Sequence, residues 1–286
     1  MDVPDTRRIV LLGKTGAGKS SLANTIFGEE VFALNHTLNS ETKQCQAKTK
    51  AINGKKVTLI DNPGFFDPGR SEEDMKPELL KCFTECAPGP HAFLIVLKVE
   101  KFTEHEKAVV KQMCEHFSED ALTHATIVFT HGDQLPEEMK IEEYIRESDC
   151  LSDLVKKCGG RCHIVDNKYW KNNQQDEYRS NNFQVTMLLN TIEKIVTEKD
   201  GGYFTNEKLQ AVESEIQKEE ERIRRSSVNM PQEDIRHTAK SNVCKKQVEK
   251  ASWTWKNGFV GLAVITGLLA TVTAVLMKVL YYQKQK

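Results

Sequence analysis

The residues best suited to chemistry stand near the N-terminus, where a short apolar run leads directly into a glycine-rich segment. The segment follows the pattern G-x-x-x-x-G-K-S and comprises Gly13, Lys14, Thr15, Gly16, Ala17, Gly18, Lys19, Ser20 and Ser21. Glycines let the backbone curl so that successive N–H groups point at phosphate oxygens, and a following helix adds the positive end of its dipole. Lys19 is expected to reach the β- and γ-phosphates, and Ser20 to hold Mg²⁺. The strand before this segment and the helix after it favour a phosphate-binding loop over an ordinary glycine-rich turn.

A second element follows the apolar run Val57–Ile60. Asp61-Asn62-Pro63-Gly64 matches the D-x-x-G element that follows the third strand in GTPases. Asp61 is expected to contact Mg²⁺ through water, and Gly64 to offer its N–H to the γ-phosphate. Because that last contact exists only before hydrolysis, it would act as a spring for the loop that follows.

A threonine between these two elements is expected to complete the metal site. Thr42 is the preferred switch threonine, with its hydroxyl on Mg²⁺ and its N–H on the γ-phosphate, and Thr37 competes for the role. Spacing alone leaves both candidates open.

Two short motifs bear on the choice of base. Thr130-His131-Gly132-Asp133 stands where GTPases place N/T-K-x-D. Asp133 can accept hydrogen bonds from guanine N1–H and the exocyclic amine, a pairing that adenine cannot offer. His131 replaces the usual lysine and would lie over the base, and Asn167 would line the other edge of the purine. Guanine is therefore preferred, with adenine binding by a P-loop kinase as the alternative.

The elements that must position these residues alternate between short apolar runs and helical patterns. Strands are expected at Arg8–Leu12, Ala47–Ile52, Val57–Asp61, Ala92–Lys98, Ala125–Thr130 and His163–Asp166. Helices are expected at Lys19–Phe27, Glu72–Cys86, Glu104–His116, Ile141–Lys157 and Phe183–Glu198. This order predicts an α/β P-loop GTPase fold with a mostly parallel six-stranded sheet flanked by helices. The Asn53-Gly54 turn predicts that the second and third strands form an antiparallel hairpin.

The chain changes character after Gly201-Gly202. Asn206–Arg225 is highly charged, with apolar residues near heptad spacing, which favours a solvated or domain-packed helix over a self-sufficient coiled coil. Ser226–Trp255 is polar and lysine-rich, and we interpret it as a spacer. The predicted domains are a GTP-binding domain over 1–200, a charged helical extension and linker over 201–257, and a C-terminal transmembrane anchor over 258–282.

The predicted anchor is the uncharged run Phe259–Met277. At ~1.5 Å per residue it covers roughly the ~30 Å of a bilayer hydrocarbon core. Aromatic residues that favour the membrane interface flank it on both sides: Trp253, Trp255, Tyr281 and Tyr282. Because no signal sequence precedes it, we expect a tail anchor in an intracellular membrane, with the nucleotide-binding domain in the cytosol.

Composition narrows the function classes. Lys and Arg total 40 against 41 Asp and Glu, a formal net charge of −1, and no basic stripe stands out. This balance argues against a general nucleic-acid binder. The eight cysteines are scattered and read as reduced cytosolic thiols.

Together these motifs resemble the GTPases of the immunity-associated protein family, the GIMAPs, over about residues 6–200. The resemblance rests on GKTGAGKSS, DNPGFFD, the T-K-x-C that begins at Thr42 and above all the block Pro88–Glu104. It favours Thr42, because the family's switch threonine also stands three residues before a cysteine. It further implies binding of GTP and GDP, dimerisation across nucleotide faces, and membrane anchoring in some members.

Two departures from the family pattern bear on turnover. Where some members carry an arginine implicated in hydrolysis across a dimer, this chain has Lys101, a point charge without the planar fork of arginine. No glutamine follows Gly64 to orient water, and Phe65 and Phe66 stand there instead. Slow intrinsic hydrolysis is expected. For Lys101 itself, a solvated surface charge at the end of a strand is favoured over a role in hydrolysis.

The sequence therefore predicts a membrane-tethered, septin-like protein that binds GTP or GDP with Mg²⁺ and hydrolyses GTP slowly. GTP would promote a homodimer or a hetero-oligomer with related GTPases. The competing hypotheses are a GTP-bound scaffold with negligible hydrolysis and, less favoured, a P-loop kinase.

Overall fold

The computed structural model describes residues 6–34, 44–64, 72–170, 176–226 and 229–256, which fall into two compact units, 1–205 and 206–286. The predicted switch threonine Thr42 and its competitor Thr37 lie outside the described residues, as do Phe65, Phe66 and the apolar run Phe259–Met277. Among the described residues, no helix combines the length and apolarity needed to cross a bilayer.

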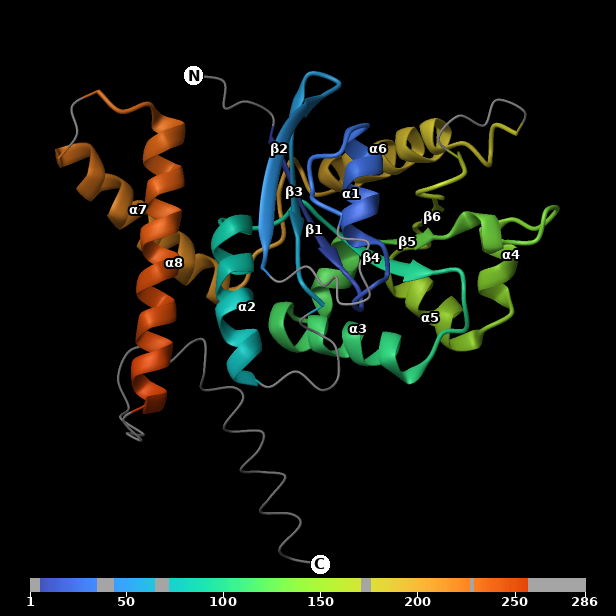
Figure 1. The fold of residues 1–286 in the computed structure, drawn as a ribbon, viewed down its shortest axis with the longest axis horizontal. Coiled ribbons are helices and arrows are strands. Elements are labelled where there is room, and N and C mark those ends of the chain that lie inside the picture. The colour runs from blue at the N-terminus through green and yellow to red at the C-terminus, as the bar shows by residue number, and fades with distance from the viewer. Residues whose placement is uncertain (1–5, 35–43, 65–71, 171–175, 227–228, 257–286) are drawn as a thin grey trace, which may run out of the picture. The chain divides into compact units, whose positions relative to one another are not determined.

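The first unit is built on a six-stranded sheet in the order β2-β3-β1-β4-β5-β6 (Figure 1). The strands are β1 (Thr6–Leu12), β2 (Gln46–Ile52), β3 (Lys55–Asp61), β4 (Ala92–Lys98), β5 (Ala125–Thr130) and β6 (Cys162–Ile164). Among these six described strands, only the β2–β3 pair is antiparallel. Asn53 and Gly54 both have positive φ, as a tight hairpin turn requires. The predicted mostly parallel sheet and its hairpin are confirmed.

Helices cover both faces of the sheet because the central strands are buried on both sides. One face packs under α1 (Lys19–Phe27) and α6 (Asn181–Glu198), where Leu22 and Leu188 join Ile9, Leu11 and Leu94 in one core cluster. The other face packs under α2 (Glu72–Cys86) and α3 (Glu104–Phe117). There the rings of Phe83 and Phe93 stand 4.9 and 5.0 Å from that of Phe117. Residues alternating along each strand thus serve two separate cores.

The predicted helix over Ile141–Lys157 is wrong, because two helices occupy the span: α4 (Ile141–Arg146) and α5 (Asp149–Lys157). Ser148 between them is extended, and its side chain accepts a hydrogen bond from the backbone N–H of Leu151. A serine cap of this kind starts a new helix. Short 3₁₀ segments η1 (Glu119–His124) and η2 (Gly132–Gln134) flank β5.

The last strand is shorter than the predicted His163–Asp166. The amide side chain of Asn181 binds both backbone groups of Asp166, accepting from its N–H at 3.1 Å and donating to its carbonyl at 2.6 Å. The assigned strand ends at Ile164; Val165 still donates its N–H to the carbonyl of Phe129 in β5 at 2.8 Å, whereas Asp166 is bound by Asn181 instead. Asp166 is thereby directed to the end of the sheet.

The second unit is a pair of helices, α7 (Glu207–Ser226) and α8 (Gln232–Lys256), that pack against each other. Most of the segment Ser226–Trp255, interpreted from its sequence as a spacer, forms the helix α8. Charged side chains join the pair: Arg236 binds Glu213 and Glu220, and Lys246 binds Glu219, at N–O distances of 2.7 to 3.0 Å. Among the described residues, α7 therefore has a helical partner in its own chain.

Candidate phosphate and base site

The glycine-rich segment forms a loop between β1 and α1, at the carboxyl end of the central strand. Gly13 has a φ of +155°, and a Cβ there would lie 2.5 Å from the carbonyl oxygen of Val96, so only glycine fits. Gly18, at φ +89°, caps α1. Gly13 and Ala17 are buried and Gly16 is exposed, whereas the half-buried members are Lys14, Thr15, Gly18, Ser20 and Ser21.

Lys19 lies folded into this loop. Only 6% of the residue is exposed, and its Nζ donates to the carbonyls of Gly13 at 2.9 Å and Lys14 at 3.0 Å. An ammonium group is thus held beneath a run of curled backbone at a helix N-terminus. This arrangement can neutralise a phosphate anion.

Ser20 and Asp61 come from different elements and meet beside the loop, where Ser20 Oγ donates to Asp61 Oδ2. Asp61 is 1% exposed, and its Oδ1 has no hydrogen-bond partner in the described part of the chain. Burial raises the pKa of Asp61, while the Ser20 hydroxyl and the Lys19 charge oppose the rise. A hydroxyl beside a buried carboxylate with a spare oxygen fits a hard cation such as Mg²⁺. Residues 20 and 61 are therefore brought together, and Thr42 is not described.

The rest of the D-x-x-G element is tied to the central strand. Asn62 is buried and its amide donates to the carbonyl of Leu11 at 3.2 Å. Gly64 is buried and ends the described segment. Two neighbouring strands thus deliver the phosphate loop and this element to one edge of the sheet.

Thr130 links the same loop to the predicted base motif. Its hydroxyl is within hydrogen-bond distance of the carbonyls of Ala17, at 2.8 Å, and Leu97, at 3.2 Å. Nearby, the side-chain carbonyl of Asn167 accepts from the Thr25 hydroxyl at 3.0 Å. The end of β5 therefore contacts the phosphate loop, and the turn after β6 contacts the helix α1 that follows the loop.

His131 and Asp133 follow Thr130 at the end of β5. His131 adopts a left-handed backbone and its Nδ1 stands 3.1 Å from Thr130 Oγ1. Asp133 is exposed, and its backbone N–H donates to Asp166 Oδ2 at 3.3 Å. A hydrogen bond that the protonated Asp133 carboxyl donates to the Asp166 side chain is the main cause that raises the pKa of Asp133. Because it is exposed, the Asp133 side chain is accessible to the edge of a bound base.

Asp166 and Trp170 organise this region and did not emerge from the sequence. Asp166 is 2% exposed, and its Oδ1 accepts from the N–H groups of Lys168 at 2.8 Å and Tyr169 at 2.5 Å. Trp170 is buried directly against Gly132, where a Cβ would lie 2.6 Å from the indole ring. The local signal for Asp166 is its position at the end of a predicted strand and directly before Asn167, the residue predicted to line the purine. Nothing local marks Trp170, because its partner stands far away in sequence.

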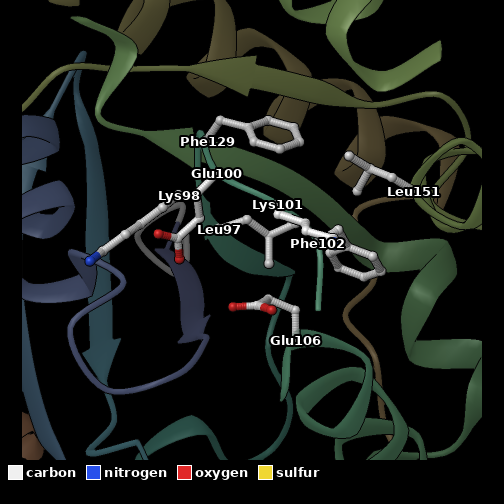
Figure 2. Close-up of a pocket in the computed structure, with 8 residues that line it drawn as sticks. All are labelled: Leu97, Lys98, Glu100, Lys101, Phe102, Glu106, Phe129 and Leu151. Carbon is white, nitrogen blue, oxygen red and sulfur yellow. The ribbon is translucent and has the colours of Figure 1, made fainter. Parts of the chain in front are cut away.

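Lys101 is exposed on the loop between β4 and α3. This loop borders a shallow hollow whose apolar side consists of Leu97, Phe102, Phe129 and Leu151, as Figure 2 shows. The acidic side consists of Glu100 and Glu106. Both carboxylates also contact Lys14 of the phosphate loop, at 2.6 Å each. The side chain of Lys14 is thus engaged with carboxylates, and its carbonyl with Lys19.

Comparison with known families places this site in context. Residues 7–226 match the AIG1 family. The chain belongs to this family. Among AIG1 relatives, human GTPase IMAP family member 8 is 32% identical over 203 residues, which cover 71% of this chain and 30% of that protein. Immune-associated nucleotide-binding protein 7 of Arabidopsis thaliana is 31% identical over 216 residues, 73% of this chain and 67% of that protein. The chain thus spans about three tenths of the length of the mammalian relatives it matches.

Solved structures of other proteins are also similar to this AIG1 chain. Toc33 from Arabidopsis thaliana, in complex with Mg²⁺ and GMPPNP, aligns with a TM-score of 0.53 and 22% identity, covering 68% of this chain and 86% of Toc33. A Toc33 structure with GDP and Mg²⁺ aligns equally well. At this identity the likeness establishes a shared P-loop GTPase fold.

Proposed function

We propose that this AIG1 protein binds GTP and GDP with Mg²⁺, hydrolyses GTP slowly, and uses GTP to switch its dimerisation or hetero-oligomerisation on a cytosolic membrane face. The observation that carries the proposal is the phosphate loop. There Lys19 is held by two loop carbonyls beside the Ser20–Asp61 pair, while Asp133 lies exposed beyond Thr130. Residues at one edge of the sheet would then bind the phosphates, the metal ion and the base.

The comparisons support the nucleotide and the assembly. One relative is named a GTPase and another a nucleotide-binding protein. For the chloroplast translocon components atToc33 and psToc159, dimerization is important for GTPase activity. In our proposal residues 1–200 form the GTP-binding domain, 201–257 the charged extension and 258–282 the membrane anchor.

Hydrolysis in this scheme is attack of water on the γ-phosphorus. A P–O bond forms, the bond to the β–γ bridging oxygen breaks, and GDP and inorganic phosphate leave. Lys19 and the backbone amides of the loop would counter the negative charge on the phosphate oxygens. Mg²⁺, held by Ser20 and Thr42 and through water by Asp61, would supply further positive charge to the same oxygens. Gly64 would donate its N–H to the γ-phosphate.

In this proposal, Lys101 of one subunit contacts the nucleotide bound to the other subunit of the dimer. It is exposed on a loop that Lys14 joins to the phosphate loop, so a partner docked on this face would meet it. A lysine there stabilises spread charge less well than an arginine would, because it lacks the planar fork. Slow turnover by the dimer follows.

The test is hydrolysis per molecule, in single turnover, as a function of protein concentration. We expect the rate to rise with concentration, Lys101→Ala to flatten the rise, and Lys101→Arg to steepen it. Lys111→Ala, which removes an exposed lysine from the middle of α3, is the matched control.

Each other outcome selects a different function. Flat profiles with monomeric GTP-loaded protein would favour a monomeric switch. Tight GTP binding without turnover at any concentration would favour a scaffold. Equal competition by ATP would favour a P-loop kinase.

A further inference from the structure

The loop between β4 and α3 is fixed at both ends. At its start the N–H of Val99 donates to the carbonyl of Thr130 at 3.0 Å, and the hydroxyl of Tyr144 donates to the carbonyl of Glu100 at 2.7 Å. At its end the N–H and hydroxyl of Thr103 donate to Glu106 Oε2 at 2.9 and 2.5 Å, forming a capping box on α3. Lys101 and Phe102 lie between these fixed points.

One side chain of the phosphate loop contacts both ends. Lys14 Nζ stands 2.6 Å from Glu100 Oε1 and 2.6 Å from Glu106 Oε1. Figure 2 shows the two carboxylates pointing into the same space beside Leu97. Lys14, Glu100 and Glu106 are here called the Lys14 cluster. It joins residues more than eighty positions apart in the chain.

The Lys14 cluster is partly shielded from water. The Glu106 side chain is 6% exposed and that of Lys14 25%, against 40% for Glu100. Burial acts to raise the pKa of Glu106, but the ion pair with Lys14 and the hydrogen bonds from Thr103 prevail and lower it to about 2. Charged hydrogen bonds in such surroundings are stronger than solvated surface pairs. The loop therefore remains attached while Glu106 is ionised.

The same residue also touches the phosphate-reading lysine. The carbonyl of Lys14 accepts from Lys19 Nζ at 3.0 Å, so its backbone binds Lys19 while its side chain binds the β4–α3 loop. A phosphate that draws Lys19 toward itself would change the hydrogen bond between Lys19 and the carbonyl of Lys14. The side chain of Lys14 would then transmit this change to the β4–α3 loop.

We propose that Lys14 is a positioning residue which, through Glu100 and Glu106, couples the phosphate loop to the loop 99–103 and so sets the position of Lys101. The hydrolytic part of this inference rests on the proposed function, whereas the coupling itself does not. A nucleotide in the phosphate loop would then order the face that a second copy of the chain meets.

The first test is amide hydrogen exchange of the full-length protein without nucleotide. Glu106→Gln keeps the capping box, because glutamine serves at that position too, but removes the charge that faces Lys14. We expect peptides over 99–104 to exchange about tenfold faster in Glu106→Gln and in Lys14→Met than in the wild type. Glu104→Gln is the matched control, since this neighbouring glutamate is 88% exposed and pairs only with Lys107 among the described contacts. Equal exchange in all four proteins would overturn the coupling.

The second test repeats the exchange with GMPPNP and Mg²⁺. In the wild type both the phosphate loop and residues 99–104 should become protected, whereas in Lys14→Met protection should stay with the phosphate loop. Protection of 99–104 that is equally strong in Lys14→Met would contradict the proposal. If GMPPNP protected neither segment of the wild type, the proposed function would fail, and the nucleotide-free comparison would still decide the coupling.

The third test separates positioning from general stability. At high protein concentration Lys14→Met and Glu106→Gln should each lower kcat by about fivefold, and the double variant should lower it no further, because both changes break the same contact. Additive losses would contradict a shared contact.

Discussion

At the level of single residues, Lys19 contributes charge rather than core packing. Its Nζ donates to the carbonyls of Gly13 and Lys14, which belong to the loop and not to the apolar core, so Lys19→Ala should leave the domain folded. GTP affinity should fall by roughly 100-fold, because charged hydrogen bonds to phosphate are lost. Titration calorimetry measures the change, with the exposed Lys48→Ala as control. Affinity like that of the wild type would remove the phosphate-loop assignment.

Asp133 is predicted to read the base. In Asp133→Asn the amide can donate to the oxygen that replaces guanine's amine in xanthine, so the variant should prefer XTP and bind GTP roughly tenfold more weakly. Competition binding with GTP and XTP measures the ratio. Asp153→Asn, which removes a largely exposed carboxylate from α5, should leave the ratio unchanged. An unchanged ratio in Asp133→Asn would show that another group reads the base.

The contact between Gly132 and Trp170 makes a third residue-scale prediction. Gly132→Ala places a methyl group against the buried indole, which must move and carry the turn after β6 with it. GTP affinity and melting temperature should both fall. Trp170→Phe in the same chain removes the clashing part of the ring, so the double variant should recover part of both losses. If the double variant recovered neither GTP affinity nor melting temperature, the losses in Gly132→Ala would not come from a clash with the Trp170 ring.

At the level of elements, the α7–α8 pair depends on a carboxylate that sits between cations. The hydrogen bond from Arg222 is the main cause that lowers the pKa of Glu219 to about 2, and Lys246 and Asn242 of α8 contribute. A carboxylate with a folded-state pKa below its unfolded value stabilises the fold above the unfolded pKa of about 4.5 and stops doing so as the pH falls towards 2. Acid should therefore weaken the pair.

Urea unfolding followed by helical circular dichroism checks this expectation. Glu219→Gln should lose about 1–2 kcal/mol at neutral pH and respond less than the wild type to a change from about pH 6 to about pH 3. Glu221→Gln, on the exposed side of α7, is the control. Equal pH dependence in the wild type and Glu219→Gln would mean that Glu219 is not the responsible group.

The sequence predicts an element well where the interactions that form it are between residues close together in the chain. Apolar runs and the Asn53-Gly54 turn are local signals, and they gave the six strands and the hairpin with boundaries within two residues. The break at Ser148 was missed because an apolar pattern continues across it. The helix α8 was missed because its polar composition resembles a linker, although its partner α7 pairs with its charges.

The candidate site divides in the same way. Lys19, Ser20, Asp61 and Asp133 belong to short motifs and could be found from spacing. Asp166, Trp170 and Glu106 act through partners more than thirty residues away, or on another element, so no local period marks them. Contacts of that kind become visible only in three dimensions.

At the scale of the whole molecule, the run Phe259–Met277 is predicted to fix the protein to a membrane. A fluorescent reporter carrying residues 253–286 should sediment with membranes and resist salt extraction, because an uncharged run of this length favours the hydrocarbon core. The same reporter with Leu268→Arg and Leu269→Arg should stay in the supernatant, since charges at the centre of a span are costly. A soluble reporter with the native run would exclude the tail anchor.

The folded-in position of Lys19 also decides whether the cost of ordering its side chain falls on the folding of the domain or on the binding of a ligand. Ordering a side chain with four methylene groups costs entropy, about 1.5–2 kcal/mol for lysine. Here the loop carbonyls already order it, so that cost belongs to the folding of the domain and not to the capture of a ligand. A phosphate that arrives meets a side chain with few conformations left to lose. The domain is correspondingly less stable on its own and more strongly stabilised by whatever occupies the loop.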